Sequence, residues 1–309
     1  MMVRPVAGHY CPLLKRPVHC CVVSTQLPRL LAGLVDDAAV FPPGSAPLPE
    51  AVPAHRRHRL SWYAELVGPL LVPASAVATR ALHPLVDPAD DLVVGLIGDT
   101  GLDGLPAALA AVPPGVTIRQ VEVAVAVRDE DPQPGLTTLL ALAQSLGQPT
   151  VYAEIPLAVG LMGALDVLVG ARAAGLPVAA KFRTGGPAAE LFPTPAELAA
   201  VIHACQQRKL PFKLTAGLHH AVRHLDPATG FTHHGFANVL AAALVAAEGA
   251  GVEQITELLT TTDPRPLLAP IAQGLAAARP LWVGYGSCSI LEPLTDLIQL
   301  GLVNGGTDT

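Results

Sequence analysis

Eight short, almost wholly apolar runs punctuate this chain of 309 residues, and Ala- and Leu-rich stretches separate them. Runs that are apolar at nearly every position are typical of parallel strands that helices cover on both faces. The predicted strands are Leu30–Val35, Pro69–Val72, Leu92–Ile97, Gln120–Val127, Thr150–Ile155, Val178–Phe182, Pro211–Thr215 and Leu281–Tyr285. This alternation restricts the fold to an α/β architecture.

The stretches between the strands predict helices, several of which have recognisable first turns. They include Pro49–Val67, Leu105–Val112, Leu136–Leu146, Pro195–Arg208 and Asn238–Glu248. Thr194-Pro195-Ala196-Glu197 has the pattern of a capping box with proline at the first helical position. Asp263-Pro264 is a second N-cap signal, and Ser289-Ile290-Leu291-Glu292 is a second candidate box.

Eight strands that alternate with helices over about 280 residues predict a single-domain (β/α)8 barrel. A doubly wound open sheet is the alternative, but no G-x-G-x-x-G motif follows the first predicted strand. The segment between the seventh and eighth strands is long enough for two or three additional helices. Residues 1–28 are rich in Pro, His and Cys without periodicity, so we expect an N-terminal extension before a barrel domain at 29–309.

Composition excludes several classes of protein. Hydrophobic residues make up 51% of the chain and charged residues 14%, which excludes a disordered chain. The net charge is −6 and no Lys/Arg stripe occurs, which argues against nucleic-acid binding. No window of about 20 residues lacks both charges and helix breakers, so no transmembrane helix is expected. Five scattered cysteines fit a reducing cytoplasm.

Charged residues within or after the predicted strands are the main functional signal. They are Asp36 and Asp37 after the first strand, Asp99 after the third, Glu122 in the fourth, Glu154 in the fifth, Lys181 and Arg183 in the sixth, and Lys213 in the seventh. Catalytic groups of barrels lie at the carboxyl ends of the strands, so we expect one polar ring around one mouth. The alternative is a buried salt-bridge network that only fixes the strand register.

Two lysines dominate this ring. Lys181 and Arg183 share one face of the sixth strand, and Lys213 and Thr215 share one face of the seventh. Adjacent parallel strands lie about 4.8 Å apart, so the two ammonium groups are expected to be neighbours and to lower the pKa of one lysine. A neutral lysine is the nucleophile that forms a Schiff base with a carbonyl substrate.

The motifs around these lysines resemble a known family. Lys181-x-x-Thr184-Gly185-Gly186, followed 32 residues after Lys181 by Lys213-x-Thr215-Ala216-Gly217, is similar to the class I deoxyribose-phosphate aldolases, over about residues 150–290. The resemblance implies that Lys181 forms the Schiff base and that Lys213 tunes it. It also implies that the turn Gly284–Ser289 binds phosphate. Together with Arg183 and Arg223, which are predicted from their charge rather than from the resemblance, the predicted anion-binding residues are Thr184, Gly185, Gly186, Thr215, Gly217, Gly286, Ser287 and Ser289.

The acidic group that relays protons has several candidates. Asp99, Glu122 and Glu154 all compete for this role, and so does one aspartate of the Asp36-Asp37 pair, with Asp37 among the predicted catalytic residues. Arg183 occupies a position that is small in the family, and it would bind an anionic substrate group or depress the lysine pKa.

Five of the eleven histidines follow Lys213 in one loop: His219, His220, His224, His233 and His234. His219 or His220 is predicted to act as a general acid or base, with Arg223 clamping a carboxylate or phosphate. Alternatively, His219, His220 and His234 would bind zinc or another divalent metal with Glu122 or Glu154. Cys288 lies at a predicted helix N-terminus. We expect it to serve as a small turn residue, and a nucleophilic role is the alternative.

The sequence therefore predicts a cytoplasmic lyase of the class I aldolase kind, without a cofactor, acting on a small carbonyl compound with a phosphate or carboxylate. A metal-dependent hydrolase, lyase or isomerase is the first alternative, and a non-catalytic binding barrel is the second. No nucleic-acid or membrane partner is expected, and a homo-oligomer stays open.

Overall fold

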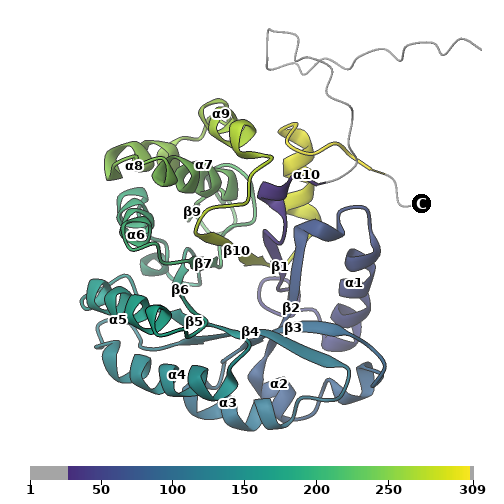
Figure 1. The fold of residues 1–309 in the computed structure, drawn as a ribbon. Helices are drawn as coiled ribbons and strands as arrows, with labels where there is room; N and C mark the ends of the chain where they lie inside the picture. The colour runs from purple at the N-terminus through teal and green to yellow at the C-terminus, as the bar shows by residue number, and fades with distance from the viewer. Residues whose placement is uncertain (1–26, 307–309) are drawn as a thin grey trace, which may run out of the picture.

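The computed structural model describes residues 27–306, and within them eight parallel strands close into a barrel in the order β1-β10-β7-β6-β5-β4-β3-β2 (Figure 1). The strands are β1 (Val35–Asp37), β2 (Val67–Pro73), β3 (Leu92–Ile97), β4 (Val116–Ala124), β5 (Thr150–Glu154), β6 (Val178–Arg183), β7 (Phe212–Thr215) and β10 (Trp282–Ser287). The predicted (β/α)8 barrel is confirmed.

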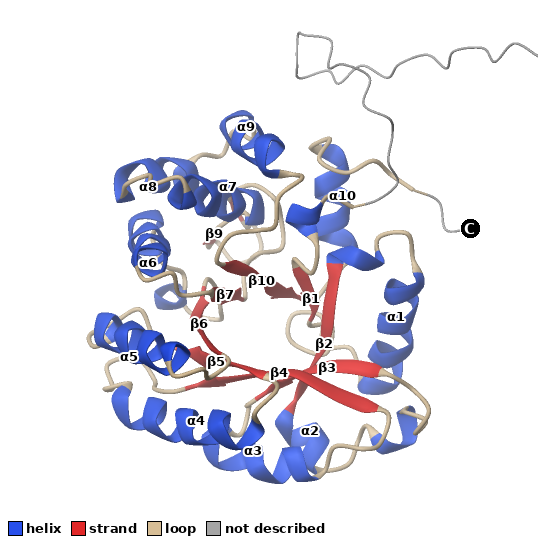
Figure 2. Cartoon of the chain, viewed as in Figure 1, coloured by secondary structure: helices blue, strands red, loops and turns tan. Residues whose placement is uncertain are grey.

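Helices form a ring outside the strands (Figure 2). They are α1 (Leu48–Leu60), α2 (Ala74–Ala78), α3 (Gly101–Ala110), α4 (Gln133–Leu146), α5 (Leu161–Ala173), α6 (Pro195–Gln207), α7 (Phe236–Ala247), α8 (Val252–Thr260), α9 (Arg265–Gly274) and α10 (Leu291–Gln299). Between β7 and β10 the chain adds α7, α8 and α9, as the length of that segment predicts. It also adds an unpredicted two-stranded hairpin, β8 (His224–Leu225) and β9 (Thr232–His233).

The predicted helix starts are present as local hydrogen bonds. Thr194 and Glu197 form a complete capping box at α6, each accepting from the other's backbone N–H. Ser289 Oγ accepts from the Glu292 N–H at 3.2 Å in the first turn of α10. Asp263 accepts from the Arg265 N–H at 3.0 Å, immediately before α9. These contacts satisfy backbone donors that a helix start otherwise leaves unpaired.

The first strand differs most from its prediction. Leu30 and Leu31 lie in a 3-10 turn, Arg29–Leu31, and are fully buried in the core, whereas β1 begins only at Val35. A continuous apolar run indicates burial but does not separate a strand from another buried segment. Leu27, at the end of the predicted extension, also packs into the core. Residues 1–26, including Cys11, Cys20 and Cys21, lie outside the described residues.

The fourth strand is displaced in the other direction. It begins at Val116, four residues before the predicted start, and ends at Ala124. Its first half alternates between half-buried and exposed residues, a pattern that an apolar-run criterion overlooks. Among residues 27–306, the helices are too short or too polar to cross a bilayer.

Candidate active site in the barrel interior

A chain of alternating charges crosses the barrel interior. Lys213 Nζ contacts Asp36 of β1 and lies 2.5 Å from Oε1 of Glu122 on β4. The other oxygen of Glu122 lies 2.9 Å from Lys181 Nζ, and Lys181 in turn lies 2.9 Å from Oε2 of Glu154. Glu154 Oε1 accepts from Nε of Arg183 at 3.0 Å. Three carboxylates and three cations thus alternate, and we name this set the interior charge chain.

Glycines on neighbouring strands leave room for these side chains. A Cβ atom at Gly68 of β2 would lie 1.8 Å from Oδ1 of Asp36. A Cβ atom at Gly95 of β3 would lie 3.0 Å from the Gln120 amide nitrogen. That amide donates to Asp36 Oδ2 at 2.6 Å and to Glu122 Oε1 at 2.7 Å. The carboxylates at this end of the chain therefore have a neutral donor in addition to Lys213.

The two lysines are register partners on β6 and β7, as predicted. The predicted lowering of a lysine pKa is wrong for this arrangement. Burial acts to lower the pKa of Lys181, but Glu122 and Glu154 outweigh it and raise the pKa. Burial opposes the charge of Lys213 as well, but Asp36 and Glu122 raise its pKa. Glu122 lies between the ammonium groups and converts a repulsive pair into an attractive triplet.

Burial and the neighbouring charges shift the pKa values of the three carboxylates in different directions. Burial opposes ionisation of Glu122, yet the attraction of Lys181 and Lys213 prevails and lowers its pKa to about 2. Burial also opposes ionisation of Glu154, and Lys181 and Arg183 together lower its pKa. Burial raises the pKa of Asp36, because Lys213 alone does not compensate and Glu122 adds repulsion. Asp36 is therefore the carboxylate of the set whose pKa the fold raises rather than lowers.

The interior charge chain becomes accessible at its Glu154–Arg183 end. The side chains of Lys181 and Lys213 are 4% and 2% exposed, Glu154 is 18% exposed and Arg183 is 43% exposed. Glu154 and Arg183 line a cavity of about 340 Å³, which the loops after β4, β5 and β6 also line. Its wall includes Arg128 and Phe192. Ligands of barrel enzymes enter at this carboxyl end of the strands.

Two of the predicted catalytic aspartates point elsewhere. Asp37 follows Asp36 on β1, so its side chain emerges on the opposite face of the strand, where Oδ2 lies 3.0 Å from Nδ1 of His55 on α1. Asp99 is exposed, and its carboxylate accepts from the Ser75 N–H at 2.9 Å and from the Ser75 hydroxyl. Asp37 and Asp99 thus fasten helices to the barrel, and Asp36 is the aspartate that joins the interior charge chain.

The residues of the two lysine motifs hold the loops after β6 and β7 together. The Thr184 hydroxyl donates to the carbonyl oxygens of Ala216, at 2.6 Å, and Thr215, at 3.2 Å. A Cβ atom at Gly185 would lie 2.8 Å from Gly217 Cα, so these two backbones require glycine for their close approach. At Gly186 a Cβ atom would meet Leu191. Their predicted anion-binding role stays a prediction.

The remaining predicted anion-binding residues lie at or beyond the end of β10, or in the histidine loop. Ser287 Oγ donates to the Ser289 carbonyl at 2.8 Å and accepts from the Ser289 N–H at 3.3 Å, closing a tight turn around Cys288. Gly286 pairs in register with Thr215. Arg223 Nη1 lies 3.4 Å from Nδ1 of His234.

Four histidines of the loop after β7 lie in contact through their rings, His219 with His233, His233 with His224, and His224 with His220, whereas His234 lies apart from these contacts. His234 is buried and donates from Nε2 to the Pro193 carbonyl at 2.7 Å, and burial lowers its pKa to about 4. His220 Nδ1 lies 3.4 Å from Asp296. His224 and His233 are paired across the β8–β9 hairpin. Within residues 27–306, no group of potential metal ligands combines His219, His220 and His234 with Glu154, so the structure does not form the metal-ligand set of the alternative.

Sequence reasoning missed the importance of two residues and underrated two more. Gln120 bridges Asp36 and Glu122, and the ring of Tyr152 lies under Lys213, whose Nζ is 5.4 Å from the ring centroid. Glu122 and Asp36 were candidates, but neither was among the predicted catalytic residues. Period-2 alternation was the available signal, because Gln120 and Glu122 share one face of β4, as Tyr152 and Glu154 do on β5.

Comparisons of the chain with protein-family models, with curated proteins and with solved structures found no match. The class that the fold defines is a (β/α)8 barrel, and the site adds an interior charge chain beside a cavity at the mouth.

Proposed function

We propose that this barrel is an enzyme, a carbon–carbon lyase of the class I aldolase kind in which Lys181 forms an imine with a small carbonyl substrate. The observation that carries the proposal is the position of Lys181. Its Nζ lies 2.9 Å from two carboxylates near the carboxyl end of β6, and one of these, Glu154, lines the cavity at the mouth. Lys213 is held by Asp36 and Glu122 instead, which suits a supporting role.

Two arginines of the cavity support an anionic substrate. Arg183 and Arg128 line it beside Glu154, Glu190 and Glu197, so a phosphate or carboxylate on the substrate would bind at the arginine side of this mixed lining. An anion bound to Arg183 would compete with Glu154 for the guanidinium. Because Arg183 is one of the two cations that lower the pKa of Glu154, losing this partner would make Glu154 more basic. Glu154 would then accept the proton that Lys181 must lose.

The chemical steps balance without a cofactor. The neutral amine of Lys181 adds to the carbonyl carbon, and loss of water from the carbinolamine gives an iminium ion. Deprotonation of the hydroxyl on the carbon next to the breaking bond releases an aldehyde, and the electron pair of the broken C–C bond moves into the iminium to give an enamine. Protonation of the enamine carbon and hydrolysis of the iminium return the second product and the free lysine. Glu154 and Glu122 are the groups within reach to hold these protons.

Borohydride trapping tests the proposal. The full chain is incubated with small aldehydes, ketones and their phosphates, reduced, and analysed by intact mass. We expect a covalent adduct that is absent from Lys181→Met and present in Lys209→Met, an exposed lysine that serves as the matched control. Lys213→Met should form the adduct more slowly. An adduct that depends on Lys213 alone, or none from folded protein, would contradict the assignment.

The rate of trapping is expected to rise with pH. Lys181 rests as an ammonium ion because its pKa is raised above 10.5, so each pH unit below that pKa lowers the neutral fraction about tenfold. Glu122→Gln removes a carboxylate from between the lysines and should shift the rising limb to lower pH. A rate that is flat from pH 7 to 9 in the wild type would contradict the resting charge that we assign.

A further inference from the structure

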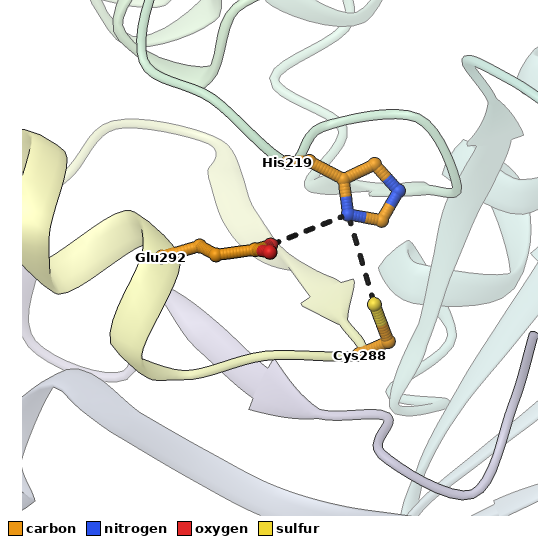
Figure 3. A group of neighbouring side chains, drawn as sticks. All are labelled: His219, Cys288 and Glu292. Atoms are coloured by element: carbon orange, nitrogen blue, oxygen red, sulfur yellow. Dashed lines mark hydrogen bonds and ion pairs between the residues drawn. The ribbon is translucent and has the colours of Figure 1, made fainter. Parts of the chain in front are cut away.

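A second cluster of reactive side chains lies at the mouth, outside the interior charge chain. His219 belongs to the loop after β7, Cys288 follows the last residue of β10, and Glu292 lies in the first turn of α10 (Figure 3). One ligand atom from each residue lies within 4.8 Å of the other two. His219 Nδ1 is 3.7 Å from Cys288 Sγ and 3.8 Å from Glu292 Oε2. We name these three residues the rim cluster.

From these distances we infer that the rim cluster is a binding site for a zinc-like divalent metal ion. With zinc bonds of 2.0–2.3 Å, two ligand atoms at a tetrahedral angle lie roughly 3.4–3.6 Å apart. The separations of 3.7 and 3.8 Å in the rim cluster are within a few tenths of an ångström of this spacing. They are longer than a strong hydrogen bond or a tight ion pair. His219 thus lies at a zinc-like spacing from both Cys288 and Glu292, and the ligand atoms of Cys288 and Glu292 lie within 4.8 Å of each other.

The donor set favours zinc among divalent ions. A thiolate, an imidazole and a carboxylate are all zinc ligands, whereas calcium and magnesium prefer sites made of oxygen alone. Three protein ligands leave a fourth tetrahedral position for water or substrate, as in catalytic rather than structural zinc sites. Figure 3 shows the three side chains pointing toward one another from two segments of the chain, the loop after β7 and the stretch that leads from β10 into α10.

The surrounding structure holds two of the ligands in place before an ion binds. The hydroxyl of Ser287 bonds to both main-chain groups of Ser289, which fixes the turn that carries Cys288. Ser289 Oγ accepts from the Glu292 N–H and fixes the first turn of α10. Gly44 of the first loop packs on the same turn, since a Cβ atom there would lie 3.0 Å from Cys288 Cβ. Fixed ligands lower the ordering cost of binding.

This inference is independent of the proposed lyase, because it rests on residues that take no part in the imine chemistry. The test is zinc binding by the full chain. Protein stripped with a chelator is titrated with Zn²⁺ against a chromophoric competitor, and with Co²⁺ while its absorption is recorded. We expect the chelator to remove one metal ion per chain from the purified protein. The stripped protein should then bind Co²⁺ and show a thiolate-to-cobalt charge-transfer band.

Matched variants locate the ion. Cys288→Ser should abolish the charge-transfer band, and His219→Ala and Glu292→Gln should each weaken zinc binding at least about tenfold. His220→Ala and Cys205→Ser should leave it unchanged, because His220 lies against Asp296 and Cys205 is buried in α6. A chain with Cys11, Cys20 and Cys21 all changed to serine should keep the site. Thermal melts of the metal-free variants check that each one folds.

Three results would overturn the inference. One is the absence of saturable Zn²⁺ binding by folded wild-type protein. Another is binding that survives Cys288→Ser with its charge-transfer band intact. The third is binding that disappears with the cysteines at positions 11, 20 and 21 while Cys288→Ser has no effect. Because lysine trapping uses neither metal nor these residues, its outcome and the zinc result can be told apart.

Discussion

The interior charge chain and the rim cluster both bring a carboxylate beside a basic side chain, but at different separations. Inside the barrel, Lys181 and Lys213 are buried and each contacts two carboxylates, with distances as short as 2.5 Å between Lys213 and Glu122. At the rim, His219 faces Cys288 and Glu292 at 3.7 and 3.8 Å, and Glu292 is half exposed. The interior groups form close ion pairs with one another, whereas the rim groups lie farther apart than in a strong hydrogen bond or a tight ion pair.

The difference teaches that proximity alone does not define reactivity in this barrel. Two adjacent lysines without a partner would repel, and one of them would become a free amine. With Glu122 between them, both are held as ammonium ions, and the nucleophile must be released by a proton transfer. At the rim, His219, Cys288 and Glu292 are less tightly paired, so we expect them to bind a metal cation from solution.

The largest effect is expected from removing the centre of the interior charge chain. Glu122→Ala leaves two buried lysines without their shared partner, and breaking a buried ion pair in this way costs about 3–5 kcal/mol of unfolding free energy. Urea unfolding at pH 7 measures it. Glu253→Gln, on the exposed face of α8, is the control and should change stability by less than about 0.5 kcal/mol. A similar small change for Glu122→Ala would show that the ion pairs do not hold the interior together.

The contribution of Glu122 should also disappear in acid. Its pKa falls from 4.5 to about 2 on folding, so the folded state binds the proton more weakly than the unfolded state. Its ionisation therefore adds stability, on the order of 3 kcal/mol, that is fully present above pH 4.5 and is lost as pH falls toward 2. Unfolding free energies of the wild type and Glu122→Gln, measured from pH 7 down to pH 3, should converge. Parallel pH curves would contradict this.

A smaller loss is expected at the other carboxylate that Lys213 contacts. Burial raises the pKa of Asp36, so its charged form is less favoured in the folded state than that of Glu122. Asp36→Asn should cost about 1–3 kcal/mol, less than Glu122→Gln under the same conditions. Urea unfolding of both variants at pH 7 provides the comparison. If Asp36→Asn is less stable than Glu122→Gln, Asp36 contributes more than Glu122 to the free energy of unfolding, and the prediction is wrong.

The smallest effect is expected at the rim. Ser289→Ala removes the acceptor for the Glu292 N–H, and loss of such a helix cap costs about 1 kcal/mol. Thermal unfolding of the metal-free protein measures this cost, and Thr194→Ala at the capping box of α6 gives a reference of similar size. Zinc affinity should fall as well in Ser289→Ala and remain unchanged in Thr194→Ala. Equal zinc affinities in the two variants would show that Ser289 does not hold the ligands of the metal site in place.

The barrel could be predicted from the sequence because its strands are short and apolar nearly throughout. The register of Lys181 with Lys213 also followed, since it depends on adjacent strands and period-2 alternation. The first strand was misplaced because Leu30 and Leu31 are as apolar as strand residues, although they pack into the core in a 3-10 turn. The β8–β9 hairpin was missed because each of its strands has only two residues.

The electrostatics could not be predicted, because they depend on residues far apart in the chain. Glu122 and Lys213 are separated by 91 positions and lie on strands that are not neighbours in the sheet, yet they meet across the closed interior. Asp36 and Asp37 are consecutive, and only the strand's orientation decides that Asp36 faces inward. Cys288 and His219 are brought together by the pairing of β10 with β7, which are adjacent in the barrel although 69 positions separate the two residues.

The charge of Lys181 in the resting protein is the central claim, and an NMR titration of its side chain tests it directly. Protein with isotope-labelled lysine is titrated from pH 6 to 11, and Lys181→Met assigns the signal. We expect Lys181 to remain protonated beyond the ordinary lysine pKa of 10.5 in the wild type, and its pKa to fall in Glu122→Gln. A wild-type midpoint below about 9 would show that repulsion from Lys213 prevails over the attraction of Glu122, and would contradict the ammonium form of Lys181.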